Sequence, residues 1–218
     1  MGKRFDLLVF DWDGTIVDSA NHIVDALQCA CADMNLPVPT PQRARYIIGL
    51  GLRDAMEYLF PEMTPLDYPS LVDRYRHHYL AGDHRVVPFP GVEAGIAELK
   101  AAGFLLAVAT GKSRAGLDRA LADTGLEQYF DRSRCADESF SKPHPEMLHV
   151  LMDALNVAPD RTLMIGDTTH DLQMAANAGV AALAVSYGAH ATKDLQDLKP
   201  LACVQSCLEL MAWLRHHA

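Results

Sequence analysis

Two aspartates that directly follow an apolar run are the residues best suited to do chemistry in this chain. Asp11 and Asp13 come after Leu7-Leu8-Val9-Phe10, and Gly14 then ends the extended pattern. The apolar run is typical of a strand buried on both faces of a parallel sheet. Side chains alternate along a strand, so the two carboxylates would project to one side if the chain stayed extended that far. Because two like charges this close repel, the pair predicts a divalent metal at the end of a strand, and the metal in turn indicates a phosphate.

Three further polar clusters follow predicted strands or precede predicted helices. They are Thr110-Gly111-Lys112-Ser113, Ser141-Lys142-Pro143 and Gly166-Asp167-Thr168-Thr169-His170-Asp171. The carboxyl ends of parallel strands meet at one edge of a sheet, and ligands bind at that edge. If the sheet is parallel, we therefore expect these clusters to converge with the first two aspartates.

From residue 86 onward, strand patterns alternate with helix patterns. Strands are predicted at 104–109, 133–135, 161–165, 181–185 and 202–204, and helices at 92–102, 113–123, 144–156, 169–178 and 206–216. This alternation is typical of an α/β fold with a doubly wound, mainly parallel, Rossmann-like sheet.

The segment between the first strand and residue 85 shows only helical patterns. They run from Ser19, a candidate N-cap, to about Met34, and then over 42–48, 52–59 and 66–80. Ordinary connections between a strand and a helix span roughly 2–6 residues, so this segment should be a domain of its own. We predict an α/β core from 1–15 and 86–218, and a helical cap domain from 16–85.

The composition excludes several classes of protein. The net charge of −9, without a block of Lys and Arg, argues against binding to a nucleic-acid backbone. No apolar run reaches the roughly 18 residues that a membrane span needs, and the N-terminus lacks the pattern of a signal peptide. The five cysteines are an odd number and form no Cys-x-x-Cys pattern. They indicate buried, reduced thiols and a cytoplasmic location.

Taken in order, the polar clusters resemble the motifs of the haloacid dehalogenase superfamily of aspartate-nucleophile phosphotransferases. The matching residues are Asp11-Trp12-Asp13-Gly14-Thr15 for the first motif, Thr110 for the second, Lys142 in Lys-Pro-His-Pro for the third, and Gly166-Asp167-x-x-x-Asp171 for the fourth. The resemblance covers nearly the whole chain, and the helical insertion resembles the type-one cap of phosphoglycolate-phosphatase-like members. Two positions depart from the pattern, since Gly111 stands where Asn is common and Trp12 where Leu or Met is more frequent.

The resemblance implies a role for each matched residue. Asp11 would be the nucleophile that takes the phosphoryl group, and Asp13 would protonate the leaving oxygen and later deprotonate water. Thr110 and the backbone N–H groups at Gly111 would bind the phosphoryl oxygens, and Lys142 would bind the substrate's phosphate and neutralise the charge that it shares with Asp11.

The cofactor implied by the resemblance is Mg²⁺. Its ligands would be the side chains of Asp11 and Asp167 and the backbone carbonyl of Asp13, with Asp171 binding directly or through a water. Asp171 could instead be a first-turn acid that stabilises a helix N-terminus. In the cap, Arg53 follows the glycine-rich segment 49–51 and could bind a carboxylate or second phosphate of the substrate, or be an ordinary arginine at the start of a helix.

The expected activity is Mg²⁺-dependent hydrolysis of a phosphomonoester through an aspartyl phosphate, with phosphoglycolate as the first candidate. A sugar-phosphate mutase similar to β-phosphoglucomutase, a pyrophosphatase and a nucleotidase use the same scaffold and stay open. The complete set of motif residues disfavours a binding module without turnover. We expect a small phosphorylated metabolite as partner, no nucleic acid or membrane, and a monomer or homodimer.

Overall fold

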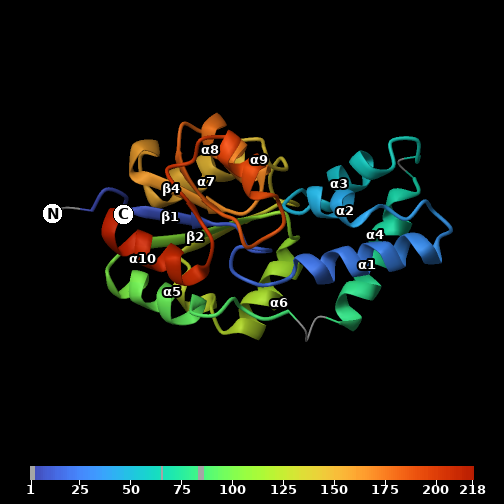
Figure 1. Ribbon diagram of the computed structural model, residues 1–218, viewed down its shortest axis with the longest axis horizontal. Helices are drawn as coiled ribbons and strands as arrows, with labels where there is room; N and C mark the ends of the chain where they lie inside the picture. Colours follow the sequence, from blue (N-terminus) through green and yellow to red (C-terminus); the bar gives the residue numbers. More distant parts are fainter. Residues whose placement is uncertain (1–2, 65, 83–85) are drawn as a thin grey trace.

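A six-stranded sheet forms the centre of the larger part of the molecule (Figure 1). The computed structural model describes residues 3–64, 66–82 and 86–218. All paired strands are parallel, in the order β3-β2-β1-β4-β5-β6. The strands are β1 (Leu7–Phe10), β2 (Leu105–Thr110), β3 (Arg132–Cys135), β4 (Thr162–Gly166), β5 (Ala181–Val185) and β6 (Cys203–Val204). The predicted fold class is confirmed.

The alternation of side chains along the central strand builds a core on each face of the sheet. Leu8 and Phe10 of β1 pack on the side covered by α5 (Val92–Ala101), α6 (Arg114–Thr124) and α10 (Cys207–His217). Leu7 and Val9 pack on the opposite side, against α7 (Glu146–Leu155) and α8 (Thr169–Asn177). The sheet is therefore doubly wound, as the sequence predicts.

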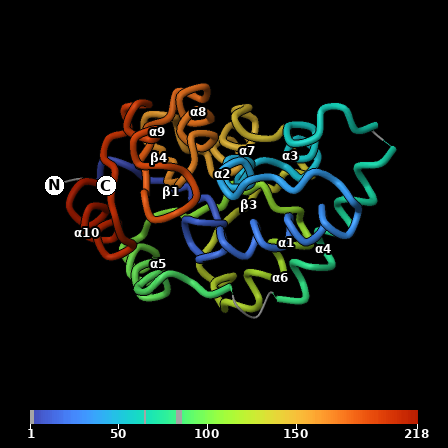
Figure 2. Tube along the Cα trace, turned by 45° about the vertical axis from the view of Figure 1, so that its right-hand side comes forward, coloured from blue at the N-terminus to red at the C-terminus, as the bar shows by residue number. Residues whose placement is uncertain are grey.

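The smaller part consists of helices inserted between β1 and β2, at the right of Figure 1. They are α1 (Ala20–Asp33), α2 (Pro41–Tyr46), α3 (Leu52–Leu59) and α4 (Tyr68–Ala81). Leu27, Met56 and Leu71 are buried in a core that these helices share, separate from the two cores of the sheet. Figure 2 shows α1 and α4 side by side in this part. We propose that residues 16–85 are a cap domain, although residues 83–85 at the predicted boundary lie outside the described residues.

The two linkers that join the helices to the sheet are hydrogen-bonded to each other. Asp18 N donates to Val87 O at 2.9 Å, and Phe89 N donates to Ile16 O at 3.0 Å. Val17 and Pro88 form an antiparallel bridge between these two bonds. The outgoing and returning chains thus form one short ribbon.

Some local expectations were wrong. The sequence did not predict α9 (Thr192–Asp197), whose only buried residue is Leu195, so no apolar period marks it. The short 3₁₀ turns at Glu127–Tyr129 and Pro159–Arg161 were also unpredicted. Of the five free cysteines, Cys29 is exposed and Cys203 half-buried, so the prediction of buried thiols holds only for the other three.

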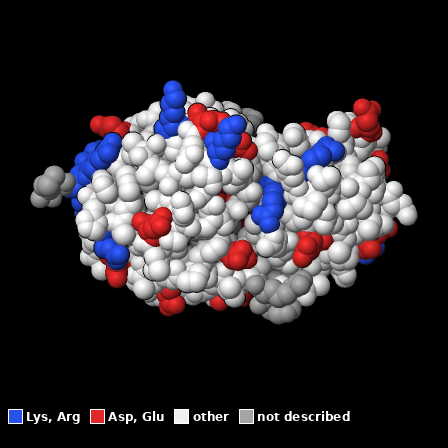
Figure 3. Space-filling model, in the orientation of Figure 1, with Lys and Arg blue, Asp and Glu red and all other residues white. Residues whose placement is uncertain are grey.

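Surface charge follows no single-sign pattern on the face drawn in Figure 3, where basic and acidic side chains are interspersed. No helix within the described ranges is long and apolar enough to cross a membrane.

Candidate active site

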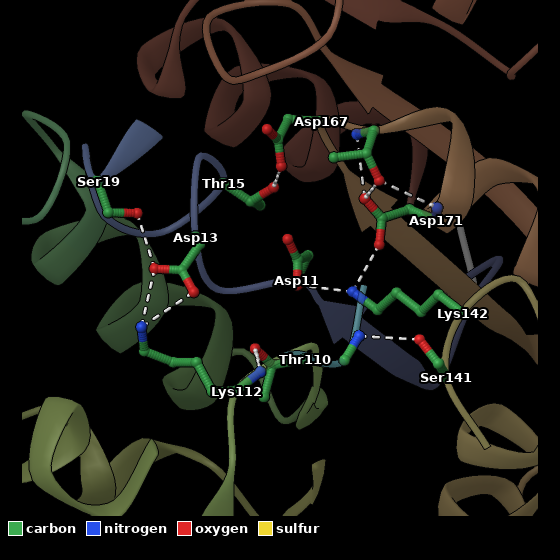
Figure 4. A network of polar contacts seen from close by, with 12 residues as sticks. Asp11, Asp13, Thr15, Ser19, Thr110, Lys112, Ser141, Lys142, Asp167 and Asp171 are labelled. Carbon is green, nitrogen blue, oxygen red and sulfur yellow. Dashed lines mark hydrogen bonds and ion pairs between the residues drawn. The ribbon is translucent and has the colours of Figure 1, made fainter. Parts of the chain in front are cut away.

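The four polar clusters meet at the carboxyl edge of the sheet. β1 pairs with β2 on one side and with β4 on the other. These neighbouring strands end at Phe10, Thr110 and Gly166, so their following residues lie side by side. Figure 4 shows the side chains of Asp11, Thr110, Lys142, Asp167 and Asp171 around one small volume.

Asp11 lies at the centre of this group. Its backbone N–H donates to Ile165 O at 2.9 Å, which continues the pairing of β1 with β4 by one residue. Its carboxylate is almost fully buried, and Oδ1 accepts a hydrogen bond from Lys142 Nζ at 2.6 Å. Oδ2 is buried and has no hydrogen-bond partner among the described residues. A buried acceptor without a donor is costly, so this oxygen is poised for a group that binds at the site.

Lys142 connects two of the acids. Its ammonium group is fully buried and lies 2.6 Å from both Asp11 Oδ1 and Asp171 Oδ1. Burial lowers the pKa of this lysine, but the carboxylates of Asp11 and Asp171 raise it by more, so the ammonium stays charged. One positive charge thus lies between two negative charges.

Asp167 is held by donors from two distant segments. Thr15 Oγ1 donates to Oδ1 at 2.8 Å, and Ala189 N donates to Oδ2 at 2.7 Å. Burial and the neighbouring Asp171 raise the pKa of Asp167 to about 7. Gly14 has a φ of +83°, and a Cβ at this position would lie 2.2 Å from Asp167 Oδ2. A side chain at position 14 would therefore displace the Asp167 carboxylate.

Asp171 lies at the start of α8, next to the other acids of the site. It is the third residue of α8 and forms a capping box with Thr168. Its Oδ2 accepts from Thr168 N at 3.0 Å and from Thr168 Oγ1 at 2.7 Å, while Oδ1 faces Lys142. The residue caps its helix and also belongs to the acidic cluster.

The three buried acids could hold a metal ion. One carboxylate oxygen each from Asp11, Asp167 and Asp171 lies within 4.8 Å of the other two. Burial raises the pKa of Asp11 well above its ordinary value, although Lys142 acts in the opposite direction. Carboxylate oxygens are the donors that Mg²⁺ prefers, and each of the three acids offers one to the same small volume. The residues present therefore fit a Mg²⁺ ion.

Asp13 turns away from this cluster. Since β1 ends at Phe10, the chain does not stay extended through Asp13, and its carboxylate does not share the direction of Asp11 (Figure 4). Lys112 Nζ donates to both of its oxygens at 3.0 Å, and Ser19 Oγ donates to Oδ1 at 2.7 Å. Ser19 is the N-cap residue of α1, as predicted, but its hydroxyl binds Asp13 rather than a backbone N–H of the helix.

Thr110 and Gly111 lie where the sheet meets the helical insertion. Thr110 is buried, and its Oγ1 accepts from Lys112 N at 3.2 Å. It does not cap the next helix, a role that Ser113 fills. A Cβ at position 111 would lie 2.5 Å from Leu50 O, so the asparagine common at this position in the family pattern would collide with the insertion's backbone.

Two further polar contacts join the insertion to the core beside the site. Ser141 Oγ accepts from Gly51 N at 2.8 Å. On the other flank, His170 Nε2 and His190 Nε2 donate to the carbonyl of Tyr46 at 2.8 and 3.1 Å. The insertion is therefore closed over the edge of the sheet.

Arg53 takes no part in these contacts. Its side chain is 77% exposed and pairs with Glu57 one helical turn later. Arg53 is the second residue of α3, and its role in binding substrate stays a prediction.

Several residues around the site were not predicted from the sequence. Thr15, Ser19 and Ser141 bind Asp167, Asp13 and Gly51. Thr15 and Ser141 lie within the predicted polar clusters and Ser19 at a predicted helix start, but the sequence assigned none of them these contacts. Lys112 lies within a polar cluster that the sequence did identify, two residues after Thr110, and this position was the available signal for its pairing with Asp13.

Comparisons with known proteins agree with this geometry. The family model described as haloacid dehalogenase-like hydrolase matches residues 8–185. A Dickeya dadantii protein named probable phosphatase IndB is 37% identical over 94% of this chain and 91% of its own length. A phosphoglycolate phosphatase of Caulobacter vibrioides is 36% identical over 83% of this chain and 79% of its own length. A crystal structure of a predicted phosphatase from Clostridium acetobutylicum superposes with a TM-score of 0.86 at 25% identity, covering 97% and 99% of the two chains. The chain therefore belongs to the haloacid dehalogenase-like hydrolase family and is a phosphatase within it.

Proposed function

We propose that this phosphatase hydrolyses the phosphomonoester of a small metabolite in a Mg²⁺-dependent reaction through an aspartyl phosphate on Asp11. The observation that carries the proposal is the buried Oδ2 of Asp11, which lacks a hydrogen-bond partner while Lys142 binds the other oxygen of the same carboxylate. An unpartnered carboxylate oxygen beside a fixed cation is suited to act as a nucleophile toward phosphorus.

In the first step, Asp11 Oδ2 attacks phosphorus and the bond to the leaving oxygen breaks. Asp13 enters this step protonated and donates its proton to that oxygen, so the alcohol leaves neutral and Asp13 becomes a carboxylate. In the second step, Asp13 takes a proton from a water that attacks phosphorus, the bond to Asp11 breaks, and inorganic phosphate is released. The two steps return both aspartates to their starting states.

The surrounding groups would stabilise charge on the phosphoryl oxygens. Lys142 supplies a fixed positive charge at 2.6 Å from Asp11. Thr110 is the last residue of β2, and Gly111 follows it directly. Asp11, Asp167 and Asp171, with the backbone carbonyl of Asp13, would hold Mg²⁺, which when bound neutralises charge shared by the phosphate and the carboxylates.

Lys112 and Ser19 keep the carboxylate of Asp13 in one orientation. Both donate to it, and the ammonium of Lys112 also donates to Tyr79 Oη at 3.1 Å. Burial lowers the pKa of Lys112, but the Asp13 carboxylate raises it by more. A proton-transfer group that is held in this way needs little reorganisation before it acts.

The names of relatives make phosphoglycolate the first candidate substrate. One is the Caulobacter vibrioides protein described above. The shared chemistry also allows other phosphorylated metabolites, including nucleotides, pyrophosphate and sugar phosphates. We propose a cytoplasmic location, which the free state of the five cysteines supports because disulfides are rare there.

The test is release of inorganic phosphate from a panel of phosphomonoesters, with Mg²⁺ and with EDTA. Asp11→Asn should lower kcat by at least about a thousandfold, and Asp13→Asn should slow both half-reactions. Asp25→Asn, an exposed aspartate on α1, is the matched control and should leave the rate unchanged. Substantial turnover by pure Asp11→Asn protein would refute the nucleophile, and an isomerised product without phosphate would indicate a mutase.

A further inference from the structure

A cavity of about 460 Å³ opens directly beside the proposed acid. Asp13, Gly111 and Lys112 form part of its wall, and the rest comes mainly from α1, α3, α4 and α6. Asp13 would donate its proton to the leaving oxygen, so the body of the leaving group must extend from that point. The cavity is the space available to it.

The walls that the insertion supplies are mainly apolar. They include Ile23 and Leu27 of α1, Ile48, Leu52 and Met56 in or before α3, and Tyr79 of α4. The remaining charged residues of the wall, Arg76, Arg119 and Asp137, are exposed and so lie where the cavity meets solvent.

Lys112, the half-buried cation of the wall beside Asp13, is already engaged. The ammonium of Lys112 donates to both oxygens of Asp13 and to Tyr79 Oη. These three acceptors match its three N–H donors. A carboxylate on a short leaving group such as glycolate would therefore lie near mainly aliphatic side chains and gain no N–H donor from Lys112.

We infer that the preferred substrates are phosphomonoesters of alcohols with a mainly apolar body of several carbon atoms, larger than glycolate; this substrate class rests on the proposed function. Small-molecule sites have volumes of roughly 300–1,000 Å³, and this cavity falls within that range. Each methylene group that enters an apolar cavity improves binding about fourfold.

The experiment is a series of n-alkyl phosphates, from methyl to butyl, assayed by phosphate release with Mg²⁺. The leaving alcohols have similar acidities, so differences in kcat/KM report contacts with the cavity. We expect kcat/KM to rise about fourfold per methylene, or about 60-fold over the series, and butyl phosphate to exceed phosphoglycolate.

A flat or falling series, or a higher kcat/KM for phosphoglycolate than for butyl phosphate, would overturn the apolar substrate class while the phosphatase activity stands. If no monoester in the series or the wider panel releases phosphate, the proposed function itself fails. The two failures are therefore distinguishable.

A pair of leucine variants tests whether the rise of kcat/KM with chain length comes from contacts with this cavity. Leu52→Asn changes the wall and should reduce the rise to less than about twofold per methylene, because a polar amide replaces apolar contact. Leu66→Asn makes the same change at a residue that is 89% exposed and outside the wall, and should leave the series unaltered. The ratio of butyl to methyl phosphate does not depend on the fraction of folded enzyme. An unchanged ratio in Leu52→Asn would overturn the assignment.

Discussion

Replacing Asp167 by asparagine should make the metal-free protein more stable. Its carboxylate shares a buried site with Asp11 and Asp171, while Lys142 supplies one positive charge. Burial and Asp171 raise the pKa of Asp167 from 3.8 to about 7. That difference corresponds to about 4 kcal/mol of destabilisation when the group is ionised.

Asparagine can preserve both hydrogen bonds of the residue. Its amide oxygen can accept from Ala189 N, and its NH₂ can donate to the hydroxyl of Thr15. Hydrogen bonds to a neutral amide are weaker than those to a carboxylate, which lowers the free energy of unfolding by about 1–2 kcal/mol. Set against the roughly 4 kcal/mol of relieved destabilisation, the variant should be more stable than the wild type by about 2 kcal/mol at about pH 8.

The sign of the pH dependence follows from the raised pKa. A carboxyl group with a raised folded-state pKa favours folding most below its unfolded pKa of 3.8, and this contribution is lost as the pH rises toward about 7. The advantage of Asp167→Asn should therefore disappear near about pH 5. Magnesium at about a hundred times its Kd adds about 2.7 kcal/mol to the wild type and should reverse the order of the two proteins.

The assay is urea unfolding in EDTA and in Mg²⁺, with Asp25→Asn as the control for loss of an exposed carboxylate. Asp25→Asn should change the free energy of unfolding by less than about 0.5 kcal/mol. If Asp167→Asn is less stable than the wild type in EDTA at about pH 8, the buried carboxylates do not repel as argued.

Three other changes test separate features by urea unfolding. Gly111→Asn should lower the free energy of unfolding by about 1–3 kcal/mol, because its Cβ would lie 2.5 Å from Leu50 O, and equal stability would contradict that contact. Lys142→Met should cost about 3–5 kcal/mol in EDTA, since it leaves buried carboxylates uncompensated, and a loss below about 1 kcal/mol would refute this. Burial acts to raise the pKa of Asp131, but Lys100 and the Leu106 N–H hold it below its ordinary value. Asp131→Asn should therefore cost about 1 kcal/mol at about pH 7, with the difference lost as the pH falls through the folded-state pKa, whereas a constant difference would exclude the charge as its cause.

The fold was predictable because its central strand carries an unambiguous pattern. Leu7–Phe10 are apolar without a break, and the structure buries them on both faces of the sheet. Gathering of the motif residues at one edge also followed from parallel strand order, since β1, β2 and β4 are neighbours. These inferences depend on strand periodicity and topology, which local sequence records well.

Side-chain directions after the strands were less predictable. Whether Asp13 follows Asp11 depends on where the chain turns, and the turn is stabilised by Ser19 and Lys112, which are distant from each other in sequence. Similarly, Asp167 is oriented by Thr15 and by the backbone of Ala189. Such pairings are set by tertiary packing: a local pattern can place Lys112 near the site, but it does not specify which side chain Lys112 binds.

The ribbon formed by the two linkers constrains how substrate can enter and product can leave. Because residues 16–18 and 87–89 are bonded to each other, the helices are attached to the sheet at one place rather than two. The motion that breaks the fewest hydrogen bonds is then a rigid-body rotation of the helical insertion about that attachment, which acts as a single hinge. Such a rotation has to separate the contacts of Gly51 with Ser141 and of Tyr46 with the two histidines, so turnover can be limited by how quickly these remote bonds part.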